Sequence, residues 1–465
     1  MTARPPLGGL RVGVYGSGGA PWHHLALAAA HGADVRPVRA EDVAAGRLAE
    51  LDALVVPGGG AVAMAGLLSP LGADGADAIR RWVEAGGAYV ASCAGSVLPL
   101  ALRGAADEAL PLARHLRMLD VPLANEGDTT LGGLASPGVG RIRVRVDTGH
   151  PFSVGVPAEI EAMHYNGPLF DVGAAPAGVR AFAWPLAATE AFTPAERFLP
   201  GAGGSADALH TLDRCIAAGA ATGIEVDVGR GRVILFGSHP EFGLGPLLLG
   251  WGHAARLLAN ALASLPARAM PSRDGGWSVR RARPDHVVSD LAADAAEALE
   301  RASARFDRLT NDPPNAWLAP DVAAAFHGRA ARDAWSEDAA AAARVARAAA
   351  SDLAALAPVL TPTDAPWLDD APRADQDFGA MGLTQLLERV HVMLDAAEAA
   401  PTAPDTPPTH AYDLFDRHPF HLAVGSYLSA AGLVSAAALT VVVLAARHDA
   451  PIPALAPVTW ANDTA

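Results

Sequence analysis

The chain has 465 residues, of which 51% are hydrophobic and 18% charged, and its formal net charge is −15. This length and composition predict a globular protein with two domains, each large enough to bury its own core. The acidic excess argues against a nucleic-acid partner, because binding to phosphates needs a positive field. All 35 basic residues are arginine. The absence of lysine excludes Walker-type phosphate loops, Schiff-base chemistry and lysine-dependent adenylation.

Two cysteines, Cys93 and Cys215, are too few for a disulfide framework. The N-terminus lacks the basic-then-apolar pattern of a signal peptide, and both features predict a cytoplasmic protein. Cys215 lies in a helix-like stretch, residues 206–218, where we expect it to be a packing residue.

Short β-rich runs alternate with helical stretches over the first part of the chain. This pattern predicts a mostly parallel sheet covered by helices on both faces. Helices are expected at Trp22–His31 and at Ala76–Ala85, the second ended by a glycine pair. The expected parallel strands are Arg11–Tyr15, Asp34–Val38, Ala53–Val56 and Ala88–Ala91.

After Asp120 the pattern becomes antiparallel. Arg141–Val146 alternates arginine with isoleucine or valine, which predicts an edge strand with one solvent-facing side. Thr222–Val228 and Arg232–Gly237 flank a Gly-Arg-Gly turn, which predicts a hairpin. A helix at Pro246–Ser264 is expected to close this part of the chain.

Beyond about Pro266 the pattern is helical and no strand is expected. We predict an α/β domain at residues 1–268, a linker at 269–284 and an acidic, Ala-rich helical bundle at 285–465. From Ser351 onward the chain carries 14 acidic residues and four arginines. This surface is a candidate for binding a protein partner or a second copy of the chain. The expected helices are Asp285–Leu309, Pro320–Leu356 with a break near Gly328, Asp377–Ala399 and Phe420–Arg447.

One stretch of the helical half has the length of a membrane span. Leu422–Ala446 is uncharged and lies between Arg417 and Arg447. Because it is rich in Ala, Gly and Ser rather than Leu and Ile, we favour a central helix buried in the bundle over a transmembrane helix.

Glu388 and His391 have the Glu-x-x-His spacing of carboxylate-bridged metal sites. Such sites need further Glu and His ligands from other helices, and the motif occurs once. We therefore expect no metal, and no cofactor of another kind is indicated.

The most informative feature of the first half is Cys93. It follows the apolar run Ala-Tyr-Val-Ala-Ser, and its neighbours at 92 and 94–96 are all small. A tight strand-to-helix elbow with an exposed thiol requires such small residues. At a helix N-terminus, unpaired N–H groups and the positive dipole end favour the thiolate over the thiol. The pattern predicts that Cys93 is a nucleophile.

A partner for this nucleophile follows the last predicted strand of the sheet, in the sequence His239-Pro240-Glu241. His239 is the candidate base, and Glu241, two residues on along an expected extended segment, would orient the imidazole. Together with Cys93 they would form a Cys-His-Glu triad.

Glycine-rich loops should lie on the same rim of the sheet. Three glycines at 58–60 directly follow a predicted strand, so the backbone N–H groups of Gly59 or Gly60 and of Ala94 are candidates for an oxyanion hole. Another loop, Ser-Gly-Gly at 17–19 with two histidines at 23 and 24, is interpreted as a turn rather than an anion site.

These segments, in this order, resemble the class I glutamine-amidotransferase-like fold. More narrowly, they resemble the branch found as the N-terminal domain of eukaryotic biotin-protein ligases and as stand-alone bacterial proteins. The resemblance covers roughly Leu10 to Leu265 and implies a flavodoxin-like sheet, with Cys93 as nucleophile, His239 as base and Glu241 as its partner. The segments are Val-Val-Pro-Gly-Gly-Gly at 55–60, Gly-Gly-Ala-Tyr-Val-Ala-Ser-Cys-Ala-Gly at 86–95, His-Tyr-Asn-Gly-Pro at 164–168 and the stretch 229–242.

The chain also departs from that family. Amidotransferases of this class usually carry glycine two residues before the cysteine and a glutamine-binding Gln soon after it, whereas Ala91 and Val97 stand here. Glutamine is therefore disfavoured as substrate. Tyr165 and Asn166 either line the pocket, as the resemblance implies, or simply end a strand.

We expect a thiol-dependent hydrolase, an amidase or an amidotransferase-like enzyme acting on a small-molecule amide or acyl substrate. The alternative is a non-catalytic binding or regulatory module that keeps the pocket, with the helical half as a partner-binding surface.

Overall fold

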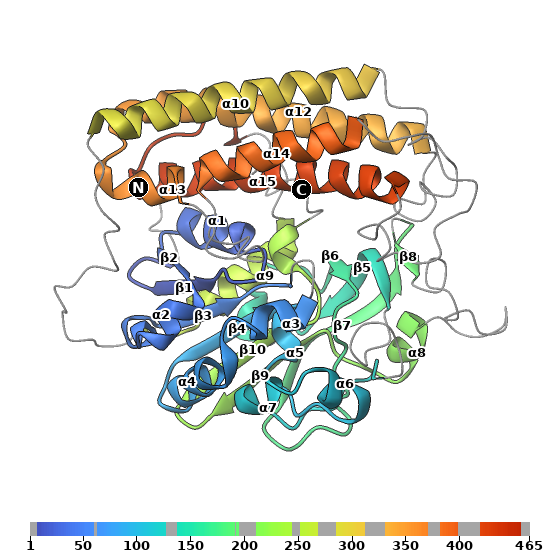
Figure 1. The fold of residues 1–465 in the computed structure, drawn as a ribbon. Coiled ribbons are helices and arrows are strands. Elements are labelled where there is room, and N and C mark those ends of the chain that lie inside the picture. Colours follow the sequence, from blue (N-terminus) through green and yellow to red (C-terminus); the bar gives the residue numbers. More distant parts are fainter. Residues whose placement is uncertain are drawn as a thin grey trace.

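The computed structural model describes residues 7–59, 63–126, 137–190, 192–194, 211–243, 252–267, 285–311, 331–370, 382–398 and 419–456. An α/β sheet region is followed by a C-terminal helical region (Figure 1). The predicted linker, the helix start at 320–330 with its break near Gly328, and the helix starts at 246–251 and 377–381 lie outside the described residues.

The sheet has ten strands in the order β2-β1-β3-β4-β10-β9-β7-β5-β6, with β8 paired to β5. The first five strands in this order are parallel, and the others are antiparallel. All four predicted parallel strands are confirmed. The strands are β1 (Arg11–Tyr15), β2 (Asp34–Val38), β3 (Ala53–Val56), β4 (Ala88–Ser92), β5 (Gly138–Val146), β6 (Glu159–Tyr165), β7 (Arg180–Ala188), β8 (Thr193–Pro194), β9 (Gly223–Val228) and β10 (Gly231–Phe236).

The prediction of an edge strand at Arg141–Val146 is wrong. This segment belongs to β5, which pairs with β6 on one side and with β7 on the other. Its alternation does mark one solvent-facing side, since Arg143 and Arg145 are exposed while Ile142 and Val144 are buried. Alternation reports burial of a face and carries no information about the number of neighbouring strands. The hairpin of β9 and β10 is confirmed, and Gly229 in its turn has φ 59°.

Helices cover both faces of the parallel part, as the sequence predicts (Figure 1). Because side chains alternate along a strand, Val14 and Val90 face α1 and α9, whereas Tyr15 and Tyr89 contribute to the core under α4. The helices of this region are α1 (Trp22–Ala30), α2 (Ala40–Ala44), α3 (Ala63–Leu68), α4 (Gly72–Glu84), α5 (Ala94–Val97), α6 (Gly104–Ala109), α7 (Ala113–Leu116), α8 (Thr211–Ala217) and α9 (Gly252–Ala263), with short 3-10 turns at η1 (Arg47–Glu50), η2 (Pro151–Ser153) and η4 (Pro240–Phe242).

The helical region lies against α1, and Figure 1 shows its long helices stacked above the sheet region. One continuous hydrophobic core joins the two, and Trp22 of α1 packs beside Leu386 and Ala436. Arg39, 4% exposed, forms an ion pair with Asp370 at 2.8 Å. The helices are α10 (Asp285–Asn311), α12 (Ala331–Leu356), α13 (Ala365–Leu368), α14 (Leu383–Glu398) and α15 (Pro419–Arg447), with 3-10 turns at η6 (Ala357–Val359) and η7 (Pro362–Asp364).

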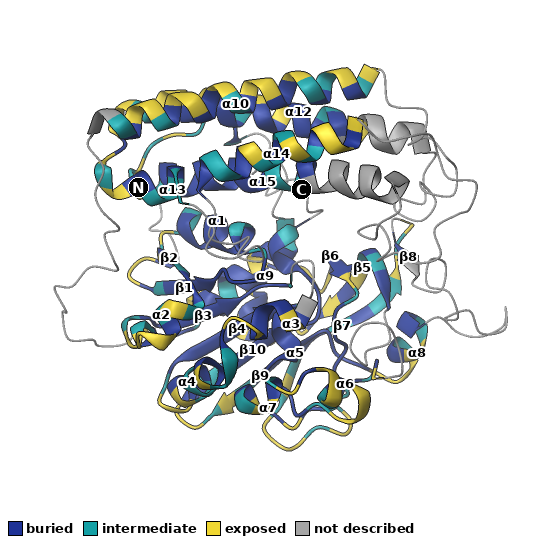
Figure 2. Ribbon diagram, viewed as in Figure 1, coloured by how far each residue is buried: buried dark blue, intermediate teal, exposed yellow. Residues whose placement is uncertain are grey.

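Within α15, the window Ala430–Arg447 is apolar and long enough to span a membrane, with a mean hydropathy of 1.9, but 83% of it is buried inside the protein. Figure 2 shows this part of the helix as buried. Burial of that extent is typical of the core helix of a globular protein and agrees with the interpretation favoured from composition.

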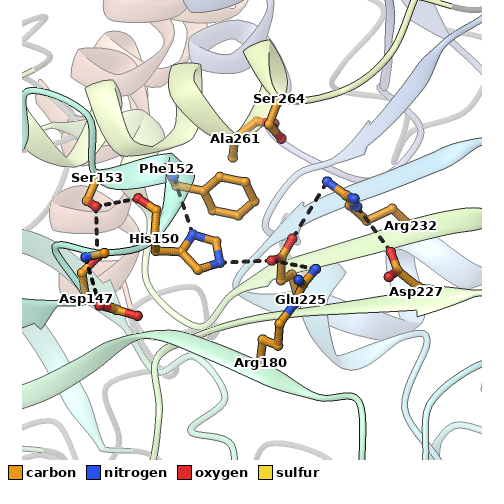
Figure 3. Close-up of polar contacts among 11 residues, drawn as sticks. Asp147, His150, Phe152, Ser153, Arg180, Glu225, Asp227, Arg232, Ala261 and Ser264 are labelled. Carbon is orange, nitrogen blue, oxygen red and sulfur yellow. Dashed lines mark hydrogen bonds and ion pairs between the residues drawn. The ribbon is translucent and has the colours of Figure 1, made fainter.

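A buried carboxylate joins the antiparallel strands beneath α9 (Figure 3). Glu225 of β9, 3% exposed, accepts a hydrogen bond from His150 Nε2 at 2.9 Å and lies 2.9 Å from the Arg180 guanidinium. Burial alone would raise the pKa of Glu225, but the bond from His150 and the charges of Arg180 and Arg232 lower it. The carboxylate therefore stays ionised within the protein and helps to hold β7, β9 and β10 together.

Candidate active site

Cys93 occupies a sharp turn between β4 and α5. Its backbone has φ 49° and ψ −120°, a conformation that residues other than glycine rarely adopt. The turn is held because Cys93 N donates to the Phe236 carbonyl at 2.9 Å and because Gly95 allows close packing on the Val56 carbonyl. Strained backbone of this kind is concentrated at functional sites. The elbow predicted from the small residues is present, and the thiol is partly exposed.

His239 is brought to Cys93 from the end of the neighbouring strand β10. The imidazole lies close enough to Cys93 for this side chain to raise the pKa of His239. Both residues crowd Gly58 after β3, where an added Cβ would lie 2.6 Å from His239 Cε1 and 3.5 Å from Cys93 Cβ. The backbone of His239 is fixed by a bond from its N–H to the Met163 carbonyl at 2.7 Å. Three parallel strands thus end around one thiol–imidazole pair.

Glu241 completes the chain of hydrogen bonds. Its Oε1 accepts from His239 Nδ1 at 2.8 Å, and the carboxyl group is 1% exposed. The expectation of an extended segment here is wrong, because residues 240–242 form the 3-10 turn η4 with Pro240 at its start. A proline fixes φ near the helical value, and the tight turn still places the carboxylate beside the imidazole.

The ionisable groups of this site shift one another's pKa values. Burial alone would lower the pKa of His239, but the adjacent Cys93 and Glu241 raise it to about 10. Burial alone would raise the pKa of Glu241, but His24 and His239 lower it to about 2. The site at neutral pH therefore holds an imidazolium between the Glu241 carboxylate and the Cys93 side chain.

Two further buried residues, which the sequence analysis did not assign to the site, contact Glu241. Ser92 Oγ donates to Glu241 Oε1 at 2.9 Å, and His24 Nε2 lies 3.3 Å from Ser92 Oγ and 3.5 Å from Glu241 Oε2. Ser92 was noted only for its size and His24 only as part of a turn. Their signal in the sequence is a hydroxyl directly before Cys93 and a histidine at the start of the helix that follows the first strand and its glycine-rich loop.

The structure describes two of the three residues that are expected to bind an oxyanion. Gly59 pairs with Gly19 at the end of β3, and Ala94 is the first residue of α5, directly after Cys93. Gly60 lies outside the described residues. The first N–H groups of a helix have no partner within it, so the Ala94 N–H is suited to the expected role.

Aromatic and amide groups border the thiol. The Tyr165 carbonyl lies 3.5 Å from Cys93 Sγ, and the Tyr165 ring, 39% exposed, meets His239 edge-on at 6.4 Å between centroids. Asn166 adopts φ 55° and is half-buried. Phe242 stacks on His239 at 4.5 Å and was missed because the turn that aims it was not predicted.

Other candidates do not join this site. Cys215 is 2% exposed in α8, and burial raises the pKa of its thiol to about 11. His391 faces Arg305 and the Ala298 carbonyl of α10. Within the described part of the chain, no group of three or more His, Cys, Asp or Glu residues is arranged to hold a metal ion.

Comparisons with known proteins give low similarity. No family model matches the chain, and no curated protein matches it. Among solved structures, a protein titled "putative gmp synthase subunit a protein" from Thermoplasma acidophilum is 16% identical, with a TM-score of 0.32, over 54% of this chain and 92% of that one. A cytoplasmic protein from Salmonella typhimurium is 13% identical, with a TM-score of 0.32, over 55% and 98%. A β-galactosidase from Bacillus circulans is 11% identical, with a TM-score of 0.26, over 52% and 32%.

Proposed function

We propose that the protein is a thiol-dependent hydrolase, an amidase or an amidotransferase-like enzyme, with Cys93, His239 and Glu241 as its catalytic triad. The observation that carries the proposal is the arrangement of the three side chains: Cys93 and His239 crowd the same glycine, Gly58, and His239 Nδ1 donates to the buried Glu241 carboxylate at 2.8 Å. The parallel strands run in the order β2-β1-β3-β4-β10, which is the flavodoxin-like order. This order supports a class I glutamine-amidotransferase-like fold for residues 1–268, and the sequence motifs support its biotin-protein ligase branch. Residues 285–465 are proposed as a helical domain that shares a core with the sheet region.

The proposed reaction uses two steps of acyl transfer. The Cys93 thiolate forms a bond to the carbonyl carbon, and the carbonyl electron pair moves to an oxygen held by the backbone N–H groups of Gly59, Gly60 and Ala94. Collapse of this intermediate expels the amine, which takes the proton of His239. Water then attacks the thioester while His239 accepts its proton, and the thiolate leaves from the carboxylic acid product.

The substrate is proposed to be a small-molecule amide or acyl compound other than glutamine. Val97 stands where related amidotransferases usually carry the glutamine-binding residue, and it is 1% exposed, so no amide side chain is presented there. The same observation favours the second candidate, a small-molecule-binding or regulatory module whose acidic helical region binds a partner. A cytoplasmic location is proposed for either role, because both cysteines are free thiols rather than a disulfide, which fits a reducing compartment.

Labelling with a panel of acyl and amide electrophiles, read out by intact mass, tests the enzyme proposal. Chloroacetamides, acyl phosphates and activated esters should modify the wild-type protein once, at Cys93. Cys93→Ala should abolish the adduct, and the control Cys215→Ala should leave it unchanged. If water releases at least one acyl adduct in wild type but not in His239→Gln, the protein catalyses hydrolysis and His239 takes part in it. Equal labelling of wild type and Cys93→Ala would refute the proposal, and a stable adduct with every electrophile would favour the binding role.

A further inference from the structure

The second hydrogen bond on Glu241 lies outside the triad itself. Glu241 Oε1 receives two donors, His239 Nδ1 at 2.8 Å and Ser92 Oγ at 2.9 Å. The Ser92 hydroxyl carries a single proton, which it gives to the carboxylate, so its oxygen is left to accept from His24 Nε2 at 3.3 Å. The four side chains form a line from His24 through Ser92 and Glu241 to His239.

This arrangement requires a neutral His24 with its proton on Nε2. The side chain is 3% exposed, and its Nδ1 has no hydrogen-bond partner in the described part of the chain. A buried Nδ1 without a partner costs little free energy when it carries a lone pair in the neutral ring. It costs far more when it carries an unpaired N–H in the charged ring. Burial and the charge of His239 lower the pKa of His24, against the attraction of Glu241. At neutral pH the ring therefore supplies one directed N–H and no charge.

The position of His24 is fixed from both sides. The residue lies on α1, between the sheet and the helical region (Figure 1). Trp22, two residues before it, packs against α14 and α15 through Leu386 and Ala436. Ser92 is fixed as the last residue of β4, with its Cα in register with Phe236 of β10. Helix α1 and strand β4, which are far apart in the sequence, thus each place a side chain against the Glu241 carboxylate.

We propose that Ser92 and His24 are positioning residues for Glu241. They hold its carboxylate in the plane and direction in which Oε1 accepts the hydrogen bond from His239 Nδ1, so that the imidazole keeps this proton while it faces Cys93. The inference rests on the proposed function, since it assigns these residues a role in the same thiol site. It adds to that function a dependence on α1, and so on the contact between the sheet and the helical region.

The pH profile of Cys93 alkylation by iodoacetamide separates this role from simple packing. A well-held imidazolium keeps the thiolate populated at low pH, so wild type should react rapidly down to mildly acidic pH. In Ser92→Ala the carboxylate loses a donor, and hydrogen bonds to charged groups carry about a ten-fold effect or more. We expect the alkylation rate at pH 6 to fall about ten-fold relative to the rate at pH 9, which moves the midpoint of the profile upward. His24→Leu should do the same.

Matched variants complete the test. Ser96 is fully buried in the same elbow, and its Oγ donates to the Phe236 carbonyl rather than to Glu241. Ser96→Ala should therefore leave the midpoint in place, while His24→Gln, which keeps a side-chain N–H, should restore most of the loss seen in His24→Leu. If His239→Gln moves the profile but Ser92→Ala and His24→Leu do not, the positioning role is refuted and the triad stands. If His239→Gln moves nothing, the proposed function itself fails.

Discussion

The Glu241→Gln variant keeps the shape of the side chain but removes its charge, so the pKa of His239 should fall towards its ordinary value. His239 has a pKa of about 10 instead of 6.5, raised by Cys93 and Glu241 against the effect of burial. An opposite charge in contact typically contributes about 1–3 pKa units. In Glu241→Gln the imidazole keeps an oxygen acceptor for its Nδ1 proton but loses the nearby negative charge. We therefore expect its pKa to fall by about 1–3 units, or about 1.4–4 kcal/mol of imidazolium stabilisation.

Histidine Cε1–H resonances, followed by NMR from pH 5 to 11, report this change directly. The His239 signal is assigned by its loss in His239→Gln. The wild-type signal should stay in the imidazolium position through neutral pH, whereas in Glu241→Gln it should titrate at a lower pH. An exposed acid serves as the matched control, since Asp227→Asn removes a carboxylate that is 66% exposed on its side chain. An unchanged His239 titration in Glu241→Gln would refute the argument that the carboxylate holds this proton.

Three further outcomes follow from the same structure. Glu225→Gln should lower the free energy of unfolding by about 3 kcal/mol in urea titration, because a buried ion cluster is broken; a loss below about 1 kcal/mol would mean that the cluster contributes little. Glu241 has a folded pKa of about 2, below its ordinary 4.5, so it contributes stability of about 3 kcal/mol above pH 4.5 that is lost as pH falls through 2. Glu241→Gln should therefore flatten the acid limb of stability against pH, and an unaltered limb contradicts this assignment. Gly95→Ala should abolish rapid alkylation of Cys93, since the new methyl group overlaps the Val56 carbonyl; retained reactivity would show that the elbow can adjust.

The convergence of the triad could be predicted from sequence because it depends on local patterns and one topological rule. Apolar runs at Ala53–Val56 and Ala88–Ala91, each followed by small residues, indicate parallel strands whose carboxyl ends meet on one rim. The last strand before His239 joins the same rim, as β10 pairs in parallel with β4. The sequence predicts this last strand only as part of a hairpin, so placing Cys93 and His239 together also depends on their motifs and on the family resemblance.

The failures share a physical cause, which is that they depend on contacts between elements. The alternation of Arg141–Val146 predicts an edge strand, yet β7 and β6 flank it, because a strand alternates in the same way with one neighbour or two. His24 carries no pattern of its own, and only the docking of α1 on the sheet brings it to Ser92 and Glu241. Strand periodicity likewise gave no sign of the η4 turn that stacks Phe242 on His239.

The most direct test of the account compares the two thiols of the chain in one sample. Iodoacetamide at neutral pH, followed by peptide mapping, measures Cys93 and Cys215 side by side, and the second is buried with a pKa raised to about 11. Cys93 should be alkylated faster than free cysteine, His239→Gln should slow this reaction, and Cys215 should stay unmodified. Alkylation of Cys93 at the rate of free cysteine, unaffected by His239→Gln, would contradict the central claim that the imidazole activates this sulfur.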